Sequence, residues 1–404
     1  MLTWDRLQTL GGISDEPGRL TRLTRLFGGT GMATASTRIG EWLRGARLTV
    51  TADDWGNLFA RTPHPHSMPL LVIGSHFDTV PNAGKYDGAL GILTALGAIE
   101  SFSWDEIKRL PFAIEIAAFS DEEGTRFQTT YLGSRAAAGG ILPADLKRTD
   151  AKGQTLASLI SPRSHQPEPR YKKGNLIAYW EAHIEQGPVL EALDVPLAVV
   201  TGIAGQTRAR IQFKGCAAHA GTCPMNLRHD ALAGAAEFVL AVETLARETE
   251  GLVGTVGCLE ITEPGSNVVP AAATLTLDLR HLLDESRRQA QTTLKTKAQK
   301  IAVDRGLTLQ WDIVQENPAT VCAPSQMALL ADAAATSQKS VPELCSGAGH
   351  DAVALSRIAP VGMLFVRCKG GVSHHPDESV SPADVSATVK ALATAIRLLA
   401  EKMK

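Results

Sequence analysis

Long apolar runs are missing from this chain of 404 residues. A transmembrane helix needs about 20 consecutive apolar residues. The most apolar stretch, residues 231–242, is interrupted by Glu237 and predicts a buried helix instead. The first ten residues also lack the basic start and apolar centre of a signal peptide. We therefore expect neither a membrane span nor a secretion signal.

The chain also lacks an excess of positive or negative charge. The 40 Lys and Arg residues nearly balance the 42 Asp and Glu residues, which gives a net charge of −2. Binding to nucleic acid or to an anionic membrane usually requires a basic excess. The composition therefore gives no reason to expect either partner.

Paired cysteines are missing too. None of the six cysteines forms a C-x-x-C pair, which argues against a zinc knuckle or a redox motif. We interpret them as small buried residues in a reducing compartment, and this interpretation predicts a cytoplasmic protein.

The sequence does contain a regular alternation of predicted strands and helices. This alternation lies on both sides of a central segment whose predicted elements follow another order. Apolar strands are predicted at 70–75 and 111–120, with a helix at 88–102 between them. This rhythm is typical of βαβ units in a parallel or mixed sheet, in which ligands bind at the carboxyl ends of the strands. The alternation returns after residue 320 and ends with a long helix.

The central segment has its own order of elements. From residue 208 the pattern predicts strand, helix, two strands, helix and strand, which is a compact α+β unit. We therefore predict a discontinuous α/β catalytic domain, residues 1–207 and 321–404, with an inserted βαββαβ domain at 208–320.

Histidines and carboxylates gather in five short segments. Imidazole and carboxylate together suit zinc, manganese, cobalt or nickel, and no thiolate is present in these segments. Each residue alone is ambiguous, since a lone histidine or a Glu-Glu pair usually lies at the surface, but five such segments are hard to explain by chance. The segments contain His76, Asp78 and Asp87; Asp121, Glu122 and Glu123; His183 and Glu185; His350 and Asp351; and His374, His375, Asp377 and Glu378.

The spacing of these residues indicates separate tasks. Asp78, two residues after His76, can accept the second N–H of a metal-bound imidazole. Asp87, in a turn bounded by glycine, can bridge two ions. Adjacent Glu122 and Glu123 cannot both face one metal, so one can bind it while the other acts as general base.

In their order along the chain, the motifs resemble those of the aminoacylase–carboxypeptidase superfamily of di-metal hydrolases. More narrowly, they are similar to the branch of N-carbamoyl-L-amino-acid hydrolases, allantoate amidohydrolases and β-ureidopropionases. The resemblance implies an αβα di-metal domain with a mixed sheet and an inserted lid and dimerisation domain. It covers nearly the whole chain and is carried by SHFDTV, GKYDGALGIL, FSDEEGTRF, LGSRA, HIEQGPVLE, GIAGQTR, AHAGTCPM, NVVPAAATLTLDLRH, GAGHDA and GVSHHP.

The resemblance also implies a ligand set. Two divalent ions, with zinc or manganese favoured over cobalt or nickel, are implied, and Glu122 matches the general acid/base. His183 stands where peptidase-like relatives usually have a carboxylate, which favours the ureido-cleaving branch. Of the neighbours His374 and His375, we prefer His374 as the ligand, since family members keep Ser-His. The first ion is expected on His76, Asp87 and His183, and the second on Asp87, Glu123 and His374, with Asp87 bridging.

Three residues of the inserted domain, together with Gln206 just before it, match substrate-binding positions of the family. Asn267 and Arg280 would hold the substrate carboxylate, and Gln206 would make a further contact. His219, supplied by the partner subunit of a homodimer, would polarise the scissile carbonyl. Two departures, Ala83 for a frequent Gly and Cys223 for a frequent Thr, remove no expected ligand.

The reaction implied is hydrolysis of the ureido (carbamoyl) C–N bond of an N-carbamoyl-L-amino acid or allantoate. An activated water attacks, Glu122 carries its proton to the leaving nitrogen, and His219 stabilises the oxyanion. Two alternatives stay open at this point: an aminoacylase or dipeptidase with the same metals, and an inactive metal-dependent binding protein.

Overall fold

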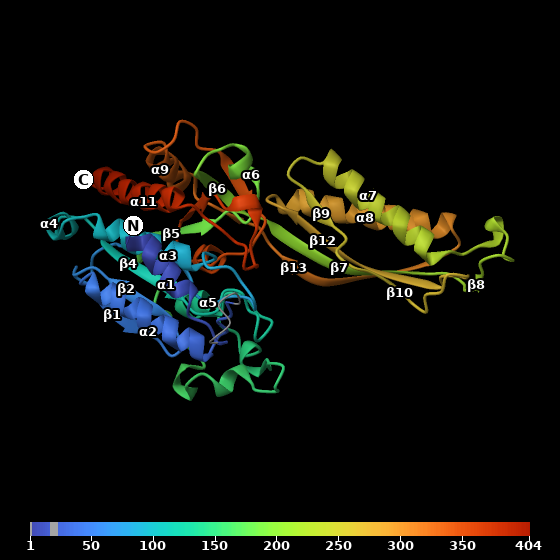
Figure 1. Ribbon diagram of the computed structural model, residues 1–404, viewed down its shortest axis with the longest axis horizontal. Helices are drawn as coiled ribbons and strands as arrows, with labels where there is room; N and C mark the ends of the chain where they lie inside the picture. Colours follow the sequence, from blue (N-terminus) through green and yellow to red (C-terminus); the bar gives the residue numbers. More distant parts are fainter. Residues whose placement is uncertain (1, 17–22) are drawn as a thin grey trace. The chain divides into compact units, whose positions relative to one another are not determined.

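The computed structural model describes residues 2–16 and 23–404, which form two compact units. The first unit consists of Met1–Thr201 and Cys322–Lys404, and the second of Gly202–Val321. The boundaries expected from the sequence were 207/208 and 320/321. Figure 1 shows that the first unit is built from both ends of the chain.

A mixed sheet organises the first unit. Among the described residues it has nine strands in the order β1-β2-β4-β3-β5-β16-β6-β14, with β15 also paired to β6. The central strands β4, β3, β5 and β16 run parallel, and the flanking pairs are antiparallel. The strands are β1 (Thr49–Ala52), β2 (Leu58–Arg61), β3 (Leu70–His76), β4 (Ala113–Phe119), β5 (Leu176–Ile184), β6 (Leu197–Ile203), β14 (Thr320–Val321), β15 (Glu343–Ser346) and β16 (Val361–Val366).

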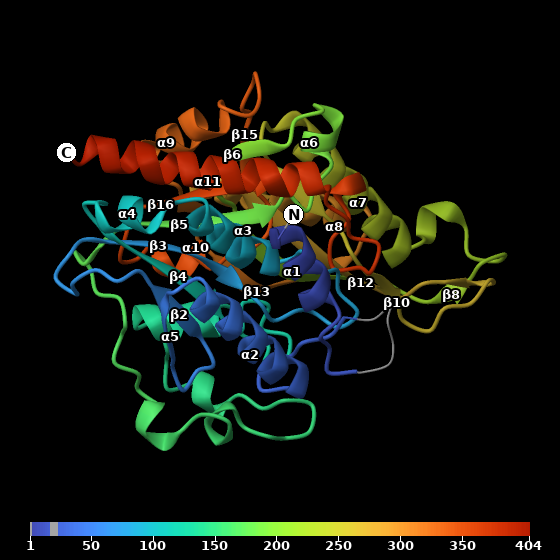
Figure 2. The ribbon, with the colours of Figure 1, turned by 60° about the vertical axis from the view of Figure 1, so that its left-hand side comes forward.

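Helices cover both faces of this sheet. Leu71 and Ile73 of β3 belong to the large core that includes α3 and α11, while the alternate residue Val72 points to the other face, as the two-residue period of a strand requires. Figure 2 shows α3 and α11 on one side of the strands and α5 on the other. The helices are α1 (Leu2–Gly11), α2 (Thr30–Gly45), α3 (Ala89–Glu100), α4 (Trp104–Lys108), α5 (Leu132–Ala138), α6 (Val189–Ala192), α9 (Pro324–Ala334), α10 (Ala352–Leu355) and α11 (Pro382–Lys402), with 3₁₀ turns at Asp145–Lys147, Leu156–Ser158, Pro162–Ser164 and Lys369–Gly371.

Local sequence explains where these elements begin and end. Ser381 caps α11 by accepting the N–H of Asp384, and Pro382 occupies the first turn, where a missing N–H costs nothing. The strands β3 and β4 are buried along their whole length, which matches their continuous apolar runs. The first unit is therefore the predicted αβα architecture.

The second unit is an antiparallel sheet with two helices on one face. Its strand order is β10-β12-β7-β13, with β9 also paired to β12. Buried apolar residues alternate along β12 and pack against α7 and α8. The elements are β7 (Gly205–Lys214), α7 (Ala231–Glu248), β9 (Val253–Thr255), β10 (Leu259–Ile261), β12 (Ala272–His281), α8 (Asp284–Asp304) and β13 (Thr308–Asn317), beside a small pair β8 (Ala218–His219) and β11 (Val268–Val269) and a 3₁₀ turn at Met225–Leu227.

Two details of the second unit differ from the expectations. The strand predicted over 251–261 is divided into β9 and β10. Thr255 pairs with Asp278 of β12 and Leu259 pairs with Leu275, so four residue steps on this segment lie opposite three on β12. The extra residue forms a bulge that separates the two strands. The predicted buried helix α7 buries one face only and leaves Leu240 62% exposed, since a single sheet covers it.

The interpretation of the cysteines as buried residues is wrong for most of them. Only Cys322 and Cys368 are buried, whereas Cys216, Cys258 and Cys345 are exposed. Cys345 lies in the short strand β15, Cys258 directly before β10, and Cys216 in the loop between β7 and β8. Among the described residues, no helix is long and apolar enough to cross a membrane.

Candidate metal centre

His76 and Asp78 lie where β3 ends, at the carboxyl edge of the parallel strands. His76 is buried, and its Nδ1 lies 3.3 Å from Oδ1 of Asp78 and 3.2 Å from the Asp78 carbonyl. The opposite ring nitrogen, Nε2, lies 3.3 Å from Oδ1 of Asp87. Asp78 therefore occupies the position predicted for it, on the far nitrogen of a histidine that faces the centre of the cluster.

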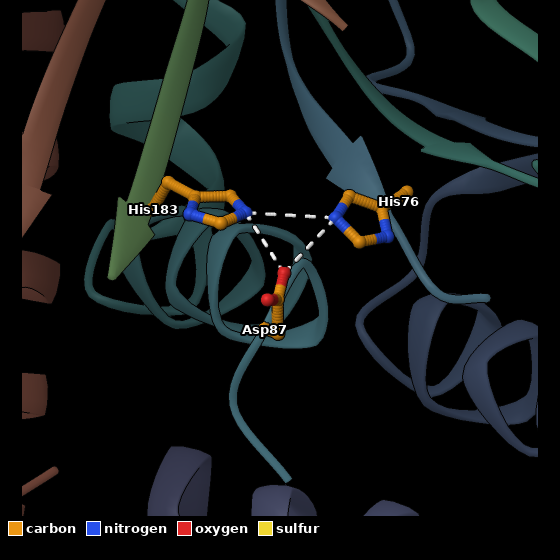
Figure 3. Close-up of side chains that lie close together, drawn as sticks. All are labelled: His76, Asp87 and His183. Carbon is orange, nitrogen blue, oxygen red and sulfur yellow. Dashed lines mark hydrogen bonds and ion pairs between the residues drawn. The ribbon is translucent and has the colours of Figure 1, made fainter. Parts of the chain in front are cut away.

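Asp87 joins two groups of side chains. Its Oδ1 lies 3.1 Å from Nε2 of His183 as well as beside His76, and its Oδ2 lies 3.3 Å from Nε2 of His374. Figure 3 shows the two imidazoles of His76 and His183 converging on this carboxylate. A carboxylate that bridges two ions must direct one oxygen to each ion, and the two oxygens of Asp87 face different histidines in this way.

The turn at Asp87 depends on the glycine that follows it. Gly88 has φ of 66°, and a Cβ built there would lie 2.5 Å from Cε1 and Nδ1 of His76. Only glycine fits so close to the ring and adopts this conformation without strain. Glu378 also fixes the turn, because its Oε1 accepts the N–H groups of Tyr86 at 2.7 Å and Asp87 at 3.1 Å.

His183, near the end of β5, completes the first group. Its Nδ1 lies 3.0 Å from the carbonyl of Ile184, so in the neutral ring the proton sits on Nδ1 and the lone pair is on Nε2. Its Nε2 lies 3.5 Å from Nε2 of His76, whose Nδ1 also faces an acceptor.

Glu122 and Glu123 follow β4 and are held by Asp78. The two carboxylate oxygens of Asp78 accept the N–H groups of Glu122 at 3.1 Å and Glu123 at 3.2 Å. Burial raises the pKa of Glu122 well above its usual value, and burial together with the charge of Asp87 raises the pKa of Glu123 to about 7. A buried carboxyl with a raised pKa suits a residue that takes up and gives back a proton.

His374, rather than its neighbour, lies at the cluster. Its Nε2 is 3.4 Å from Oε1 of Glu123 and 3.3 Å from Asp87. The side chain of His375 is 55% exposed and its Nδ1 lies 3.5 Å from Asp377. The backbone of His374 has φ of 56°, in the left-handed region that residues other than glycine rarely adopt.

The side chains of the cluster are arranged so that they could hold metal ions. Within the described chain, three groups have ligand atoms within 4.8 Å of one another: His76, Asp87 and His183; Asp87, Glu123 and His374; and His76, Glu122 and Glu123. In the first group, two imidazole lone pairs and a carboxylate oxygen converge, which is unfavourable unless a cation lies between them. The residues therefore fit divalent ions.

The third group departs from the expectation that Glu122 and Glu123 face apart, because both carboxylates come near His76. Only Glu123 also shares a group with Asp87 and His374. This difference favours Glu123 over Glu122 as a metal ligand.

Several residues around the cluster were not singled out from the sequence. Glu181 is buried and accepts hydrogen bonds from Ser75 Oγ at 3.0 Å, from Tyr179 Oη at 3.1 Å and from Ala352 N at 3.0 Å. Its position two residues before His183 on one strand was the available signal, since such residues share a face.

Gln186 and Ser373 also lie at the cluster, since both contact Oδ2 of Asp87. Each lies next to a predicted ligand segment, but neither residue type by itself indicates a metal site.

The predicted substrate-binding residues of the second unit form two pairs. His219 and Asn267 are neighbours at the small strand pair, where the N–H of Ala220 bonds to the Asn267 carbonyl at 2.8 Å. The Nδ1 of exposed His219 accepts the N–H of Gly221 at 3.1 Å, so the neutral ring carries its proton on Nε2. Gln206 and Arg280 stand opposite each other on β7 and β12.

Comparisons with known proteins show what the chain is similar to. The model of peptidase family M20/M25/M40 matches residues 72–398. Allantoate deiminase of Arabidopsis thaliana is 39% identical, covering 95% of this chain and 79% of that protein. N-carbamoyl-L-amino acid amidohydrolase of Geobacillus stearothermophilus is 37% identical, covering 98% of both. The crystal structure of an amidase of the hydantoinase/carbamoylase family from Burkholderia multivorans is similar with a TM-score of 0.90 and 32% identity, covering 98% of this chain and 96% of that one.

Proposed function

Since the chain belongs to peptidase family M20/M25/M40, we propose that it hydrolyses the ureido C–N bond of a small, carboxylate-bearing substrate. It is an amidohydrolase, an enzyme that acts on linear amide bonds. The observation that carries the proposal is the pair of His and carboxylate groups that share Asp87, with His183 in the first group. Two relatives are named after the substrates allantoate and N-carbamoyl-L-amino acids, and each of these compounds contains both a ureido group and a carboxylate.

The proposed ligands are His76, Asp87 and His183 for one ion and Asp87, Glu123 and His374 for the other. Divalent ions bound there would supply Lewis-acid activation of water. Zinc or manganese is the proposed metal, with cobalt and nickel as the other ions that this donor set accepts.

Glu122 is the proposed general acid/base. Its backbone is fixed by Asp78, and its raised pKa allows it to hold a proton and release it to the leaving nitrogen. Ammonia, carbon dioxide and an amino acid are the expected products, or ammonia, carbon dioxide and a ureido acid from allantoate.

The second unit would bind and polarise the substrate. With its proton on Nε2, His219 is a hydrogen-bond donor suited to a developing oxyanion. Arg280 and Asn267 would bind the substrate carboxylate, and Gln206 would make a further contact. In the proposed assembly, a cytoplasmic homodimer, His219 acts on the partner subunit's substrate.

An ammonia-release screen tests the proposal. Purified enzyme loaded with Mn²⁺ or Zn²⁺ is offered N-carbamoyl amino acids, allantoate and β-ureido acids, and released ammonia is measured. N-acetyl amino acids and dipeptides are offered in parallel assays that measure the released amino acid. We expect turnover of at least one ureido acid, abolished by chelation and restored by added metal. Turnover of acetyl or peptide substrates alone would make it an aminoacylase or dipeptidase, and no turnover with metal bound would make it a binding protein.

A further inference from the structure

Asp278 is the centre of a hydrogen-bonded group on the second unit. Its Oδ1 accepts Nε of Arg280 at 2.8 Å, and its Oδ2 accepts Nη2 of the same guanidinium at 3.0 Å. The same Oδ2 also accepts Nε of Arg208 at 3.0 Å and the amide of Gln206 at 2.9 Å. One carboxylate thus binds three side chains, two of which were assigned to the substrate above.

The strands bring these four residues together. Asp278 and Arg280 are two residues apart on β12, so they share a face, and the adjacent strand β7 places Arg208 opposite Asp278 and Gln206 opposite Arg280. Leu279, which lies between Asp278 and Arg280, and Leu277, which precedes them, point the other way and are buried under the helices. The backbone therefore fixes the positions of the group, independently of any ligand.

The group is half-buried and charged. The side chain of Asp278 is 24% exposed and that of Arg280 is 28% exposed. Burial raises the pKa of Asp278, but the hydrogen bonds and charges of Arg280 and Arg208 outweigh this and lower it. Asp278 is therefore an anion at neutral pH, and with the two arginines it leaves an excess of one positive charge.

We propose that Asp278 is a positioning residue that orients the guanidinium of Arg280, together with the amide of Gln206, for the substrate carboxylate. A guanidinium has two edges that can hold a carboxylate in a bidentate manner, Nε with Nη2 and Nη1 with Nη2. Asp278 takes the first edge, which fixes the plane and the direction of the guanidinium. The inference rests on the proposed role of Arg280.

Asp278→Asn tests the proposal because it keeps size and removes charge. The new NH₂ group would face N–H donors of the arginines and Gln206, so Arg280 loses its fixed orientation. Hydrogen bonds to charged groups contribute about 1.5–3 kcal/mol, and we expect KM to rise by about tenfold or more with kcat little changed. The matched control is Asp312→Asn, an exposed aspartate of β13 that accepts a hydrogen bond from Gln310 and contacts none of these four residues.

Two substrates and a second variant make the outcomes distinct. The KM and kcat of Asp278→Asn, Arg280→Met and the control are measured with an N-carbamoyl amino acid and with its neutral carboxamide. Thermal unfolding of each variant is measured as well. Support requires that Asp278→Asn raises KM for the acid only and unfolds like the control. If Arg280→Met raises KM for the acid while Asp278→Asn leaves it unchanged or lowers it, the positioning role is wrong. If Arg280→Met also has no effect, the proposed carboxylate site itself is wrong.

Discussion

Gln186 donates a hydrogen bond from Nε2 to Oδ2 of Asp87 over 2.9 Å. The same amide donates to Oγ of Ser373 at 3.0 Å, and Ser373 donates to the same Oδ2 at 2.9 Å. The bridging carboxylate is thus held by two neutral donors from two segments. These contacts orient Asp87 without adding charge that would compete with a metal.

Removing the Gln186 donor should weaken metal binding. Groups that orient a metal ligand commonly contribute about 10–100-fold in affinity, and we expect a loss in this range for Gln186→Ala and for Ser373→Ala. Competition with a metal-binding dye measures it. Gln310→Ala, on the second unit, is the control and should leave affinity unchanged. Equal affinity in all three variants would show that Asp87 needs no such support.

Gly88→Ala should damage both stability and the metal site. The residue has φ of 66°, and the added methyl would meet the ring of His76. Gly153 provides a matched control, because its φ is 78° while nothing lies within 4 Å of the Cβ position. Gly153→Ala should cost only the left-handed backbone term of about 1–2 kcal/mol, measured by chemical denaturation.

The Gly88 variant should lose more stability than this and also release metal, as seen by elemental analysis. Equal losses of stability in the two variants, with metal retained, would contradict the steric role of Gly88.

The fold and the proximity of the candidate ligands could be predicted from the sequence for a physical reason, whereas the assignment of each ligand came from the family resemblance. His76, Glu123 and His183 lie at or just after apolar strands, and the carboxyl ends of parallel strands meet at one edge, so their pattern already implies proximity. Gln186 and Asp278 were not predictable in this way, because their roles depend on side-chain hydrogen bonds. Exposure also depends on the layers above an element, which explains why α7 was expected to be more buried than it is.

Two thiols should resist modification in the folded enzyme. Cys322 and Cys368 are buried, and burial raises their pKa values to about 12 and about 11. Since the thiolate is the reactive form, iodoacetamide at pH 8 should label Cys216, Cys258 and Cys345 first. Peptide mass spectrometry before and after denaturation measures this. Labelling of Cys322 in the native enzyme as fast as that of Cys216 would contradict the packing described.

Changing Glu122 or Glu123 to glutamine should affect metal binding and turnover differently. Both carboxylates come near His76, but only Glu123 is grouped with Asp87 and His374. Glu123→Gln should therefore lose metal, because a neutral amide replaces an anionic ligand. Glu122→Gln should retain two ions per chain and lose turnover by about 10²–10⁴-fold, since the proton carrier is gone.

Metal content by elemental analysis and turnover at saturating metal distinguish the two variants. Asp121→Asn is unsuitable as a control, because Asp121 is buried beside them, and Glu263→Gln on an exposed turn of the second unit serves instead. If Glu122→Gln loses metal while Glu123→Gln keeps it, the proposed roles of the two residues are reversed. Full activity of Glu122→Gln with both metals bound would remove Glu122 from the chemistry altogether.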